Sequence, residues 1–438
     1  MTTASFDHAR STDRRSRNRI RKRKTSRMDR FSNLPIEIAH EIMSRLNFKD
    51  LTRVGCVSKA CREFYISTPY LNFHDFSGVD ISTRRKNKKV FNSLKRFFIQ
   101  RGVHLKIQCF RFRWCFFDDD HDEDFRLRLR EWIEIAVRCN VEVLHLVVTY
   151  IRFGELPASI LHCKSLKSLL VDMKCTISDV PFIDFLSNLD YLRLKDVSIK
   201  DEDDRFLKWI SCCCTSMKEL LLKDCGFWHE SDFYHIPERH VNISGDRLKK
   251  LHLNPQLRRK TKKWVNIYAP NLKCLEWFGE CTTSQNLGNL MCLEKAEISS
   301  SIPICNHDIL IDFLCSIRKV KVLILHPDIL ELLWLNMDDR KWQDLSFISQ
   351  AKEVVIPYDD YEPDIEPAYS ILEHAHDLEK MTIYYPHCFD AHDDLTDVYD
   401  DLMELRTEVM SKGIHFNIIT TSRGSSLLSS IQSLADFV

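Results

Sequence analysis

The sequence LKSLLV at residues 166–171 carries a strand motif that recurs along this chain. An aliphatic residue is followed by two variable residues, and then by two aliphatic residues separated by a variable one. LDYLRL at 189–194 and MKELLL at 217–222 are further copies. Because successive side chains of a strand point to opposite faces, each copy predicts a short strand with one buried face.

Ten copies of this strand motif lie between Val141 and Ile383. Their fourth positions are residues 144, 169, 192, 220, 251, 275, 296, 323, 354 and 381. The mean spacing is about 26 residues, which is within the range of leucine-rich repeats. A strand this short is unstable alone, so we expect the copies to stack in parallel around a shared core. The sequence predicts an α/β fold, a curved leucine-rich-repeat solenoid with a parallel sheet; a generic α/β domain with Leu-rich strands is the alternative.

The segments around the strand motifs carry helical patterns. Residues 203–214 and 307–316 have apolar side chains at helical spacing and predict return helices. Residues 393–412 alternate acidic and apolar groups at the same period. Gly413 then fits a helix C-cap, and residues 414–419 predict a closing strand. This last unit would cover the open end of the stack, as repeat arrays require.

Residues 75–135 precede the first strand motif and are expected to form a linker and an N-terminal cap or first repeat. Apolar residues in 91–99 predict a helix, Val103–Ile107 predicts the first strand of the sheet, and Trp132–Ala136 predicts a second helix. The acidic run at 118–124 is interpreted as a solvated loop, because it lacks the glycine and spacing of a calcium loop.

Residues 29–74 have a different pattern, that of three short helices. Pro35 suits a first helical position, and Ile38 and Ile42 lie four residues apart on one helix face. Ser58 fits the N-cap of the third helix. A unit of this size cannot bury so much apolar surface alone, so we expect its surplus to contact a partner.

The front stretch resembles an F-box, with its Leu34-Pro35 pair at the first helix. Leu156-Pro157, Ala269–Lys273 and Leu372–Ile383 are similar to repeat and FBD segments of the plant F-box/leucine-rich-repeat family. The resemblance implies docking onto the adaptor subunit of a cullin-type (SCF) ubiquitin ligase. The residues that match the docking face are Leu34, Pro35, Ile38, Ile42, Leu51, Val54 and Val57. Cys61 stands where many F-boxes place Trp and covers less area.

The resemblance implies a substrate-recognition subunit that is not an enzyme and whose repeats bind a protein substrate for ubiquitination. Two alternatives are a repeat scaffold acting outside a ligase and a small-molecule sensor. The substrate-binding residues stay unknown. From the strand alternation, candidates for the concave face are Lys167, Ser168, Arg193, Lys195, Lys218, Lys223, His252 and Glu276.

Composition narrows the partners. The chain has 438 residues with 63 basic and 63 acidic side chains, so no overall field favours nucleic acid or membrane, and neither is expected as a partner. Seventeen cysteines without a Cys-x-x-Cys pair favour reduced thiols in the nucleus or cytoplasm. Residues 1–28 are expected to be a disordered basic tail, in which Arg21, Lys22, Arg23 and Lys24 fit either a nuclear-import signal or a solvated tail.

No motif of an enzyme or cofactor site stands out. The ten glycines form neither a dinucleotide-binding loop nor a Walker A loop nor a G-x-S-x-G elbow. Cys212, Cys213 and Cys214 cannot surround one metal ion on a helix, because neighbouring side chains point apart. His374, His376 and the group around His387 fit scattered polar side chains better than a zinc site. We therefore expect no cofactor and no metal.

The expected organisation follows from these patterns. The predicted segments are 1–28 as the tail, 29–74 as the F-box, 75–135 as the linker and cap, 136–390 as the repeats, 391–420 as an FBD-like C-terminal cap, and 421–438 as a second tail.

Overall fold

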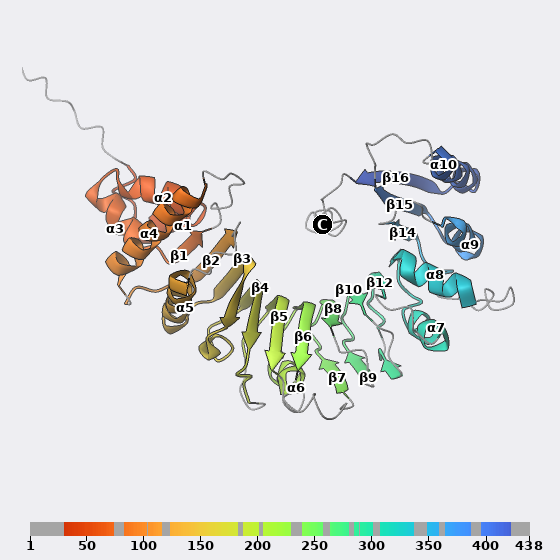
Figure 1. The fold of residues 1–438 in the computed structure, drawn as a ribbon, viewed down its shortest axis with the longest axis horizontal. Coiled ribbons are helices and arrows are strands. Elements are labelled where there is room, and N and C mark those ends of the chain that lie inside the picture. The colour runs from red at the N-terminus through yellow and green to blue at the C-terminus, as the bar shows by residue number, and fades with distance from the viewer. Residues whose placement is uncertain are drawn as a thin grey trace, which may run out of the picture.

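A computed structural model describes most of the chain. The described residues are 30–73, 83–102, 104–115, 123–182, 187–200, 205–228, 239–256, 263–279, 284–288, 290–300, 307–336, 348–358, 364–386 and 396–421. They form an arc with three small helices at one end (Figure 1).

Thirteen strands line the inner side of the arc in one sheet whose neighbours are all parallel (Figure 1). In spatial order they are β1 (Tyr70–Phe73), β2 (Cys109–Cys115), β3 (Val143–Glu155), β4 (Ser168–Ile177), β5 (Tyr191–Lys200), β6 (Glu219–Trp228), β8 (Lys250–Gln256), β10 (Cys274–Phe278), β12 (Lys295–Ser299), β13 (Val322–Leu325), β14 (Glu353–Pro357), β15 (Lys380–Pro386) and β16 (His415–Thr421). The predicted solenoid with a parallel sheet is confirmed.

The outer side of the arc is built from the return limbs. Most are helices: α4 (Thr83–Arg101), α5 (Glu123–Arg138), α6 (Arg205–Cys213), α7 (His307–Ser316), α8 (Pro327–Asn336), α9 (Glu366–His374) and α10 (Thr396–Ser411), with a 3-10 turn, η1, at Ala158–Ile160. Near the middle of the arc the limbs are strands instead: β7 (Arg239–Ser244), β9 (Lys263–Tyr268) and β11 (Ser284–Asn286) form a second parallel sheet. The helices predicted at 203–214 and 307–316 are α6 and α7.

The strand motif sets the register of the main sheet. The fourth position of every copy lies opposite the fourth position of the next, from Leu144 beside Leu169 to Val354 beside Met381. All ten of these side chains are buried in the main core. A slip by one residue would turn each of them to the open face, so burial fixes the alignment.

The first two strands of the sheet differ from the prediction. Residues 104–107 are not a strand, and the sheet begins instead with β1 and β2. The backbone carbonyl of Gln108 accepts N–H groups from Glu142 and Val143, as the carbonyl of Glu142 does from the following repeat. Ile107 is therefore the first position of a strand motif whose later apolar positions, Phe110 and Phe112, are aromatic.

The C-terminal end closes as predicted. Helix α10 buries Leu402, Leu405 and Val409 against the core, and β16 pairs with β15 as the last strand. Gly413 between them has φ +77°, the left-handed conformation that a helix C-cap requires. The tail from residue 422 lies outside the described residues.

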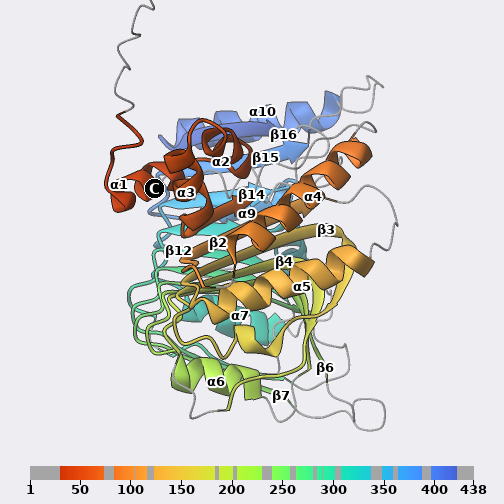
Figure 2. The ribbon, with the colours of Figure 1, turned by 90° about the vertical axis from the view of Figure 1, so that its left-hand side faces the viewer.

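Three helices precede β1: α1 (Ile36–Ser44), α2 (Phe48–Gly55) and α3 (Lys59–Ser67). Asn47 caps α2 by accepting the N–H of Asp50, and Ser58 caps α3 by accepting the N–H of Cys61. Figure 2 shows this group at the end of the arc, next to α4. The three predicted helices are thus present.

Candidate functional site

The three-helix group exposes apolar side chains. Ile36, Ile38 and Ile42 of α1 are 45%, 50% and 43% exposed, and Val57 in the turn between α2 and α3 is 72% exposed. The interior of the group is filled by other residues, among them Ala39, Met43 and Phe48. Helix α1 therefore has one apolar face in the core, while Ile38 and Ile42, four residues apart, form a second apolar face toward solvent and Ile36 is exposed at the start of the helix. We call Leu34, Pro35, Ile36, Ile38, Ile42 and Val57 the front apolar face.

The structure places the other expected docking residues differently. Pro35 is exposed and Leu34 is half-buried, beside the isoleucines of α1. Val54 is half-buried and packs against the core. Leu51 is only 1% exposed, so its expected place on the docking face is corrected to the interior. The reason is the helical periodicity of α2, because residues three apart lie on the same side and Leu51 therefore faces inward with Phe48. Ile36 was not singled out from the sequence, although it lies two residues before Ile38.

Cys61 lies inside the three-helix group. Its side chain is buried, and its Sγ is 3.9 Å from the hydroxyl of Ser32. In this structure the residue supports the packing of α3 and adds nothing to the front apolar face. The smaller side chain of Cys, compared with the Trp of many F-boxes, therefore affects the packing inside the three-helix group and not the front apolar face.

Aromatic side chains fix the three-helix group to the sheet. The ring of Phe48 in α2 lies 5.0 Å from that of Phe73 in β1 and 5.4 Å from that of Phe97 in α4, centroid to centroid. Tyr65 in α3 lies 5.0 Å from Phe97. Such edge and tilted contacts add to the free energy gained from burying the rings.

Arg101 ties the same junction together from the end of α4. Its guanidinium donates hydrogen bonds of 2.6 Å to the backbone carbonyls of Ile66, Thr68 and Lys106. The side chain is buried, and burial lowers the pKa of Arg101 to about 10, so it stays charged at neutral pH. The carbonyls belong to α3, to the segment before β1 and to the segment before β2, which makes the front apolar face and the sheet parts of one body.

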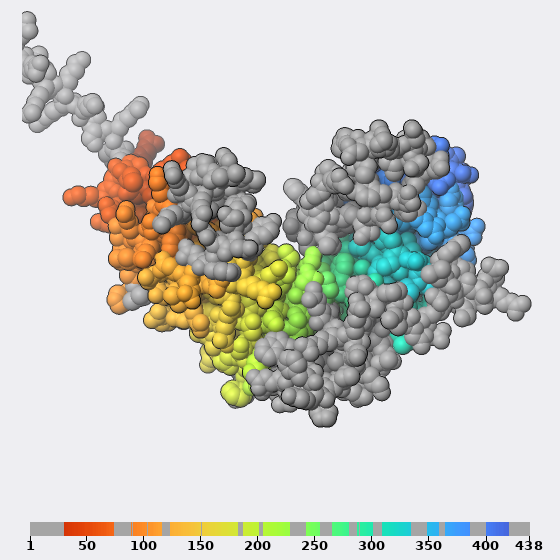
Figure 3. All heavy atoms as spheres, viewed as in Figure 1, coloured from red at the N-terminus to blue at the C-terminus, as the bar shows by residue number. Residues whose placement is uncertain are grey.

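The open face of the sheet, opposite the helices, is the second candidate surface. Figure 3 shows a hollow between the two ends of the arc, with the yellow and green residues of the middle strands at its floor. Four of the predicted concave residues are held in ion pairs that join neighbouring repeats. The pairs are Lys167 with Glu142 at 2.9 Å, Lys218 with Asp190 at 3.1 Å, Arg193 with Glu219 at 2.8 Å, and Lys195 with Asp172 at 3.2 Å. Ser168 and Lys223 are half-buried.

His252 and Glu276 are buried, which corrects the expectation that they are exposed. Nδ1 of His252 lies 2.6 Å from one carboxylate oxygen of Glu276, and Nζ of Lys250 lies 3.1 Å from the other. Burial by itself would raise the pKa of Glu276, but the hydrogen bond with His252 and the charge of Lys250 lower it to about 2. Phe278 stacks on the ring of His252 at 5.1 Å. The alternation of side chains along a strand predicted the correct face of the sheet for both residues, but it did not predict that they are buried.

The open face carries a separate apolar cluster toward the C-terminal end. Ile324, Val355 and Tyr384 lie on β13, β14 and β15 and are buried, with Ile419 of β16 partly buried beside them. These side chains point away from the main core and so do not stabilise the solenoid interior. The sequence did not indicate this cluster, because the strand motif does not show which apolar residues at its variable positions contact one another.

No group of three metal-ligating side chains occurs among the residues that the structure describes. Cys213 and Cys214 are buried while Cys212 is exposed, and burial raises the pKa of Cys214 to about 12, which keeps its thiol protonated at neutral pH. The import residues Arg21–Lys24 and His387 lie outside the described residues, as does most of the acidic run at 118–124.

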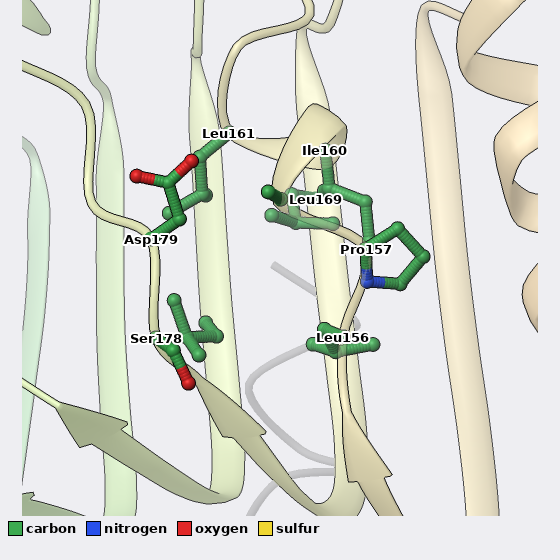
Figure 4. A pocket seen from close by; sticks show the side chains of 9 residues that line it. Leu156, Pro157, Ile160, Leu161, Leu169, Ser178 and Asp179 are labelled. Atoms are coloured by element: carbon green, nitrogen blue, oxygen red, sulfur yellow. The ribbon is translucent and has the colours of Figure 1, made fainter.

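A small, partly open cavity lies between η1 and β4 (Figure 4). Its volume is about 10 Å³, room for about one water molecule. The lining is mainly apolar and includes Leu156, Pro157, Ile160, Leu161, Leu169 and Asp179. This cavity is too small for a hormone-sized ligand. No helix within the described ranges is both long and apolar enough to cross a bilayer.

Comparison with known proteins agrees with this architecture. Residues 100–389 match the family profile described as At1g61320/AtMIF1, LRR domain, and residues 31–64 match the F-box domain. The Arabidopsis thaliana protein named putative F-box/FBD/LRR-repeat protein At4g03220 is 25% identical over 62% of this chain and 56% of its own length. The F-box/LRR-repeat protein At2g42720 of the same plant is 25% identical over 70% of this chain and 69% of its own length.

A third relative extends the likeness to another subgroup. The putative FBD-associated F-box protein At5g56440 of Arabidopsis thaliana is 27% identical over 44% of this chain and 43% of its own length. The match thus spans about half the length of two of these three relatives. The repeat profile covers well over half of the chain and follows an F-box, and so this chain belongs to the plant F-box/leucine-rich-repeat family.

Proposed function

We propose that this chain is the substrate-recognition subunit of an SCF-type (cullin-RING) ubiquitin ligase. The F-box docks the adaptor subunit of the ligase, and the repeats bind a protein substrate for ubiquitination and degradation. The chain itself does no chemistry in this role. It raises the rate of transfer by holding the substrate near the transferring subunits.

The observation that carries the proposal is the front apolar face. Three isoleucines of α1 and Val57 remain in water although the three-helix group has a filled core. An apolar helix face of this kind suits a partner that offers a hydrophobic groove. The F-box match at 31–64 supports a Skp1-like adaptor as this partner.

The experiment is a pull-down of the purified adaptor with the full chain. Ile38→Ser together with Ile42→Ser should abolish adaptor binding, and so should Leu34→Ala together with Pro35→Ala. Ile38 and Ile42 are about half exposed, so their replacement should change the free energy of unfolding little. Ile99→Ser is the matched control, because Ile99 is an exposed isoleucine on α4.

Two results would refute the proposal. One is wild-type protein that retains no adaptor, and the other is an Ile38→Ser/Ile42→Ser variant that binds as well as the Ile99→Ser control. Adaptor-independent complexes formed by the repeats would then favour the scaffold function.

A further inference from the structure

A group of cations lies on the open face of β2–β6 and forms no ion pair with another residue in the described ranges. Arg111 and Arg113 on β2 alternate with the buried residues Phe110, Phe112 and Trp114, so they face away from the core. By the same alternation the open face carries further cations on the next strands. We call the set Arg111, Arg113, Arg152, Lys174 and Lys223 the basic patch.

The members of the basic patch lack carboxylate partners within the part of the chain that the structure describes. Arg113, Arg152 and Lys174 are exposed, and Arg111 and Lys223 are half-buried. The Nε of Arg111 is buried without a hydrogen-bond partner. Two carboxylates on this face form ion pairs with cations outside the basic patch, Asp172 with Lys195 and Glu219 with Arg193. A half-buried cation without a counter-ion is costly to keep, and a bound anion removes that cost.

The spacing of the basic patch selects the kind of anion. Its members lie on β2, β3, β4 and β6, and Lys195 of the intervening β5 is paired with Asp172. Strands of a sheet are about 4.8 Å apart, so the patch runs about 19 Å across the strands. A single phosphate group is far smaller than this. An extended polypeptide covers the same distance with about six residues.

We propose that the basic patch binds an extended acidic segment of a protein partner. Carboxylates of the segment pair with one cation after another along the inner side of the arc. The inference rests on the proposed function in one respect, namely that the partner is the protein to be ubiquitinated. The binding itself requires only the sheet and its charges.

The test uses the full chain and a fluorescent Glu hexapeptide as the probe. Wild-type protein should bind this probe more tightly than a Gln hexapeptide, with an affinity that falls as salt rises. Arg113→Glu together with Lys174→Glu should weaken binding at least about tenfold. Both residues are exposed, so the fold should persist, which a thermal melt verifies. Arg96→Glu together with Arg406→Glu, exposed cations of α4 and α10, gives the same charge change away from the patch and should bind like wild type.

Several results would overturn the inference. Equal binding of the Glu and Gln peptides, or equal loss in the patch and control variants, would show that the patch does not select acidic chains. Displacement of the probe by pyrophosphate as effectively as by unlabelled hexapeptide would indicate a compact-anion site. Tighter binding of single-stranded RNA would indicate a nucleic-acid surface. Adaptor binding is measured in parallel. A wild-type chain that binds the adaptor but not the Glu probe would overturn only the acidic-segment inference, and a wild-type chain that binds the Glu probe but not the adaptor would overturn only the ligase function.

Discussion

Replacing Arg101 with Met tests how firmly the F-box is fixed to the repeats. The guanidinium of Arg101 holds three backbone carbonyls, each at 2.6 Å, from three different segments of the junction. Met fills a similar part of the space but donates no hydrogen bond, so three acceptors lose their donor. The junction should therefore open more often, while the remaining repeats keep their own core.

The size of the effect follows from two opposing terms. Three hydrogen bonds from a charged donor contribute about 1.5–3 kcal/mol each. Burial lowers the pKa of Arg101 from 12.5 to about 10, which corresponds to a cost of about 3 kcal/mol for keeping the charge inside. The balance predicts that Arg101→Met destabilises the junction by about 3 kcal/mol, and that Arg101→Lys, with its charge but without the planar fork, lies between Met and wild type.

Hydrogen exchange followed by mass spectrometry measures this directly. Amides in residues 60–73 and 104–115 should exchange about a hundredfold faster in Arg101→Met, and amides in β8 to β16 should not change. Arg96→Met is the matched control, since Arg96 is exposed on the same helix. If both variants exchange alike at the junction, the three hydrogen bonds do not hold it and the reasoning fails.

Three further predictions concern other parts of the chain. The pKa of Glu276 is lowered from 4.5 to about 2, so its contribution to stability is present above pH 4.5 and is lost as the pH falls from 4.5 toward 2. Glu276→Gln should lower the free energy of unfolding by about 3 kcal/mol at pH 7 and make urea unfolding less sensitive to acid in that window. An unchanged acid profile would contradict this prediction. Gly413→Ala should cost about 1 kcal/mol in thermal unfolding because φ is +77° there, whereas Gly226→Ala, without a positive φ, serves as the control. Removal of residues 1–28, or replacement of Arg21–Lys24 by Ala, should abolish nuclear accumulation of a fluorescent fusion, and an unchanged nuclear signal would rule out an import signal.

The register of the sheet was predictable because one physical requirement repeats in every copy of the motif. A residue such as Leu220 must be buried, and its two neighbours in the chain must then face the other side. Ala296 satisfies the same position with a much smaller side chain, so the period rather than the residue type carries the information. The C-terminal cap was predictable for a similar reason, since Gly413 ends an amphipathic helix.

Other features depend on contacts that one segment cannot reveal. Phe110 and Phe112 fill motif positions with aromatic rings because they meet α4 and α5, so a search for aliphatic residues missed β2. Leu51 looks like a docking residue by family position, yet its side chain faces the core. The burial of His252 with Glu276 depends on a partner 24 residues away on the next strand of the sheet, which alternation cannot predict.

The link between the F-box and the sheet has a consequence for the proposed function. Strand β1 begins three residues after α3 and is already the first strand of the solenoid, and Arg101 and Phe97 join α3 to α4. The front apolar face and the basic patch are therefore carried by one body, joined through β1 and α4. A partner on α1 and a partner on β2–β6 do not compete for the same residues. Transfer by proximity requires such a fixed geometry, because holding two reactants at a defined separation is what replaces a chance encounter.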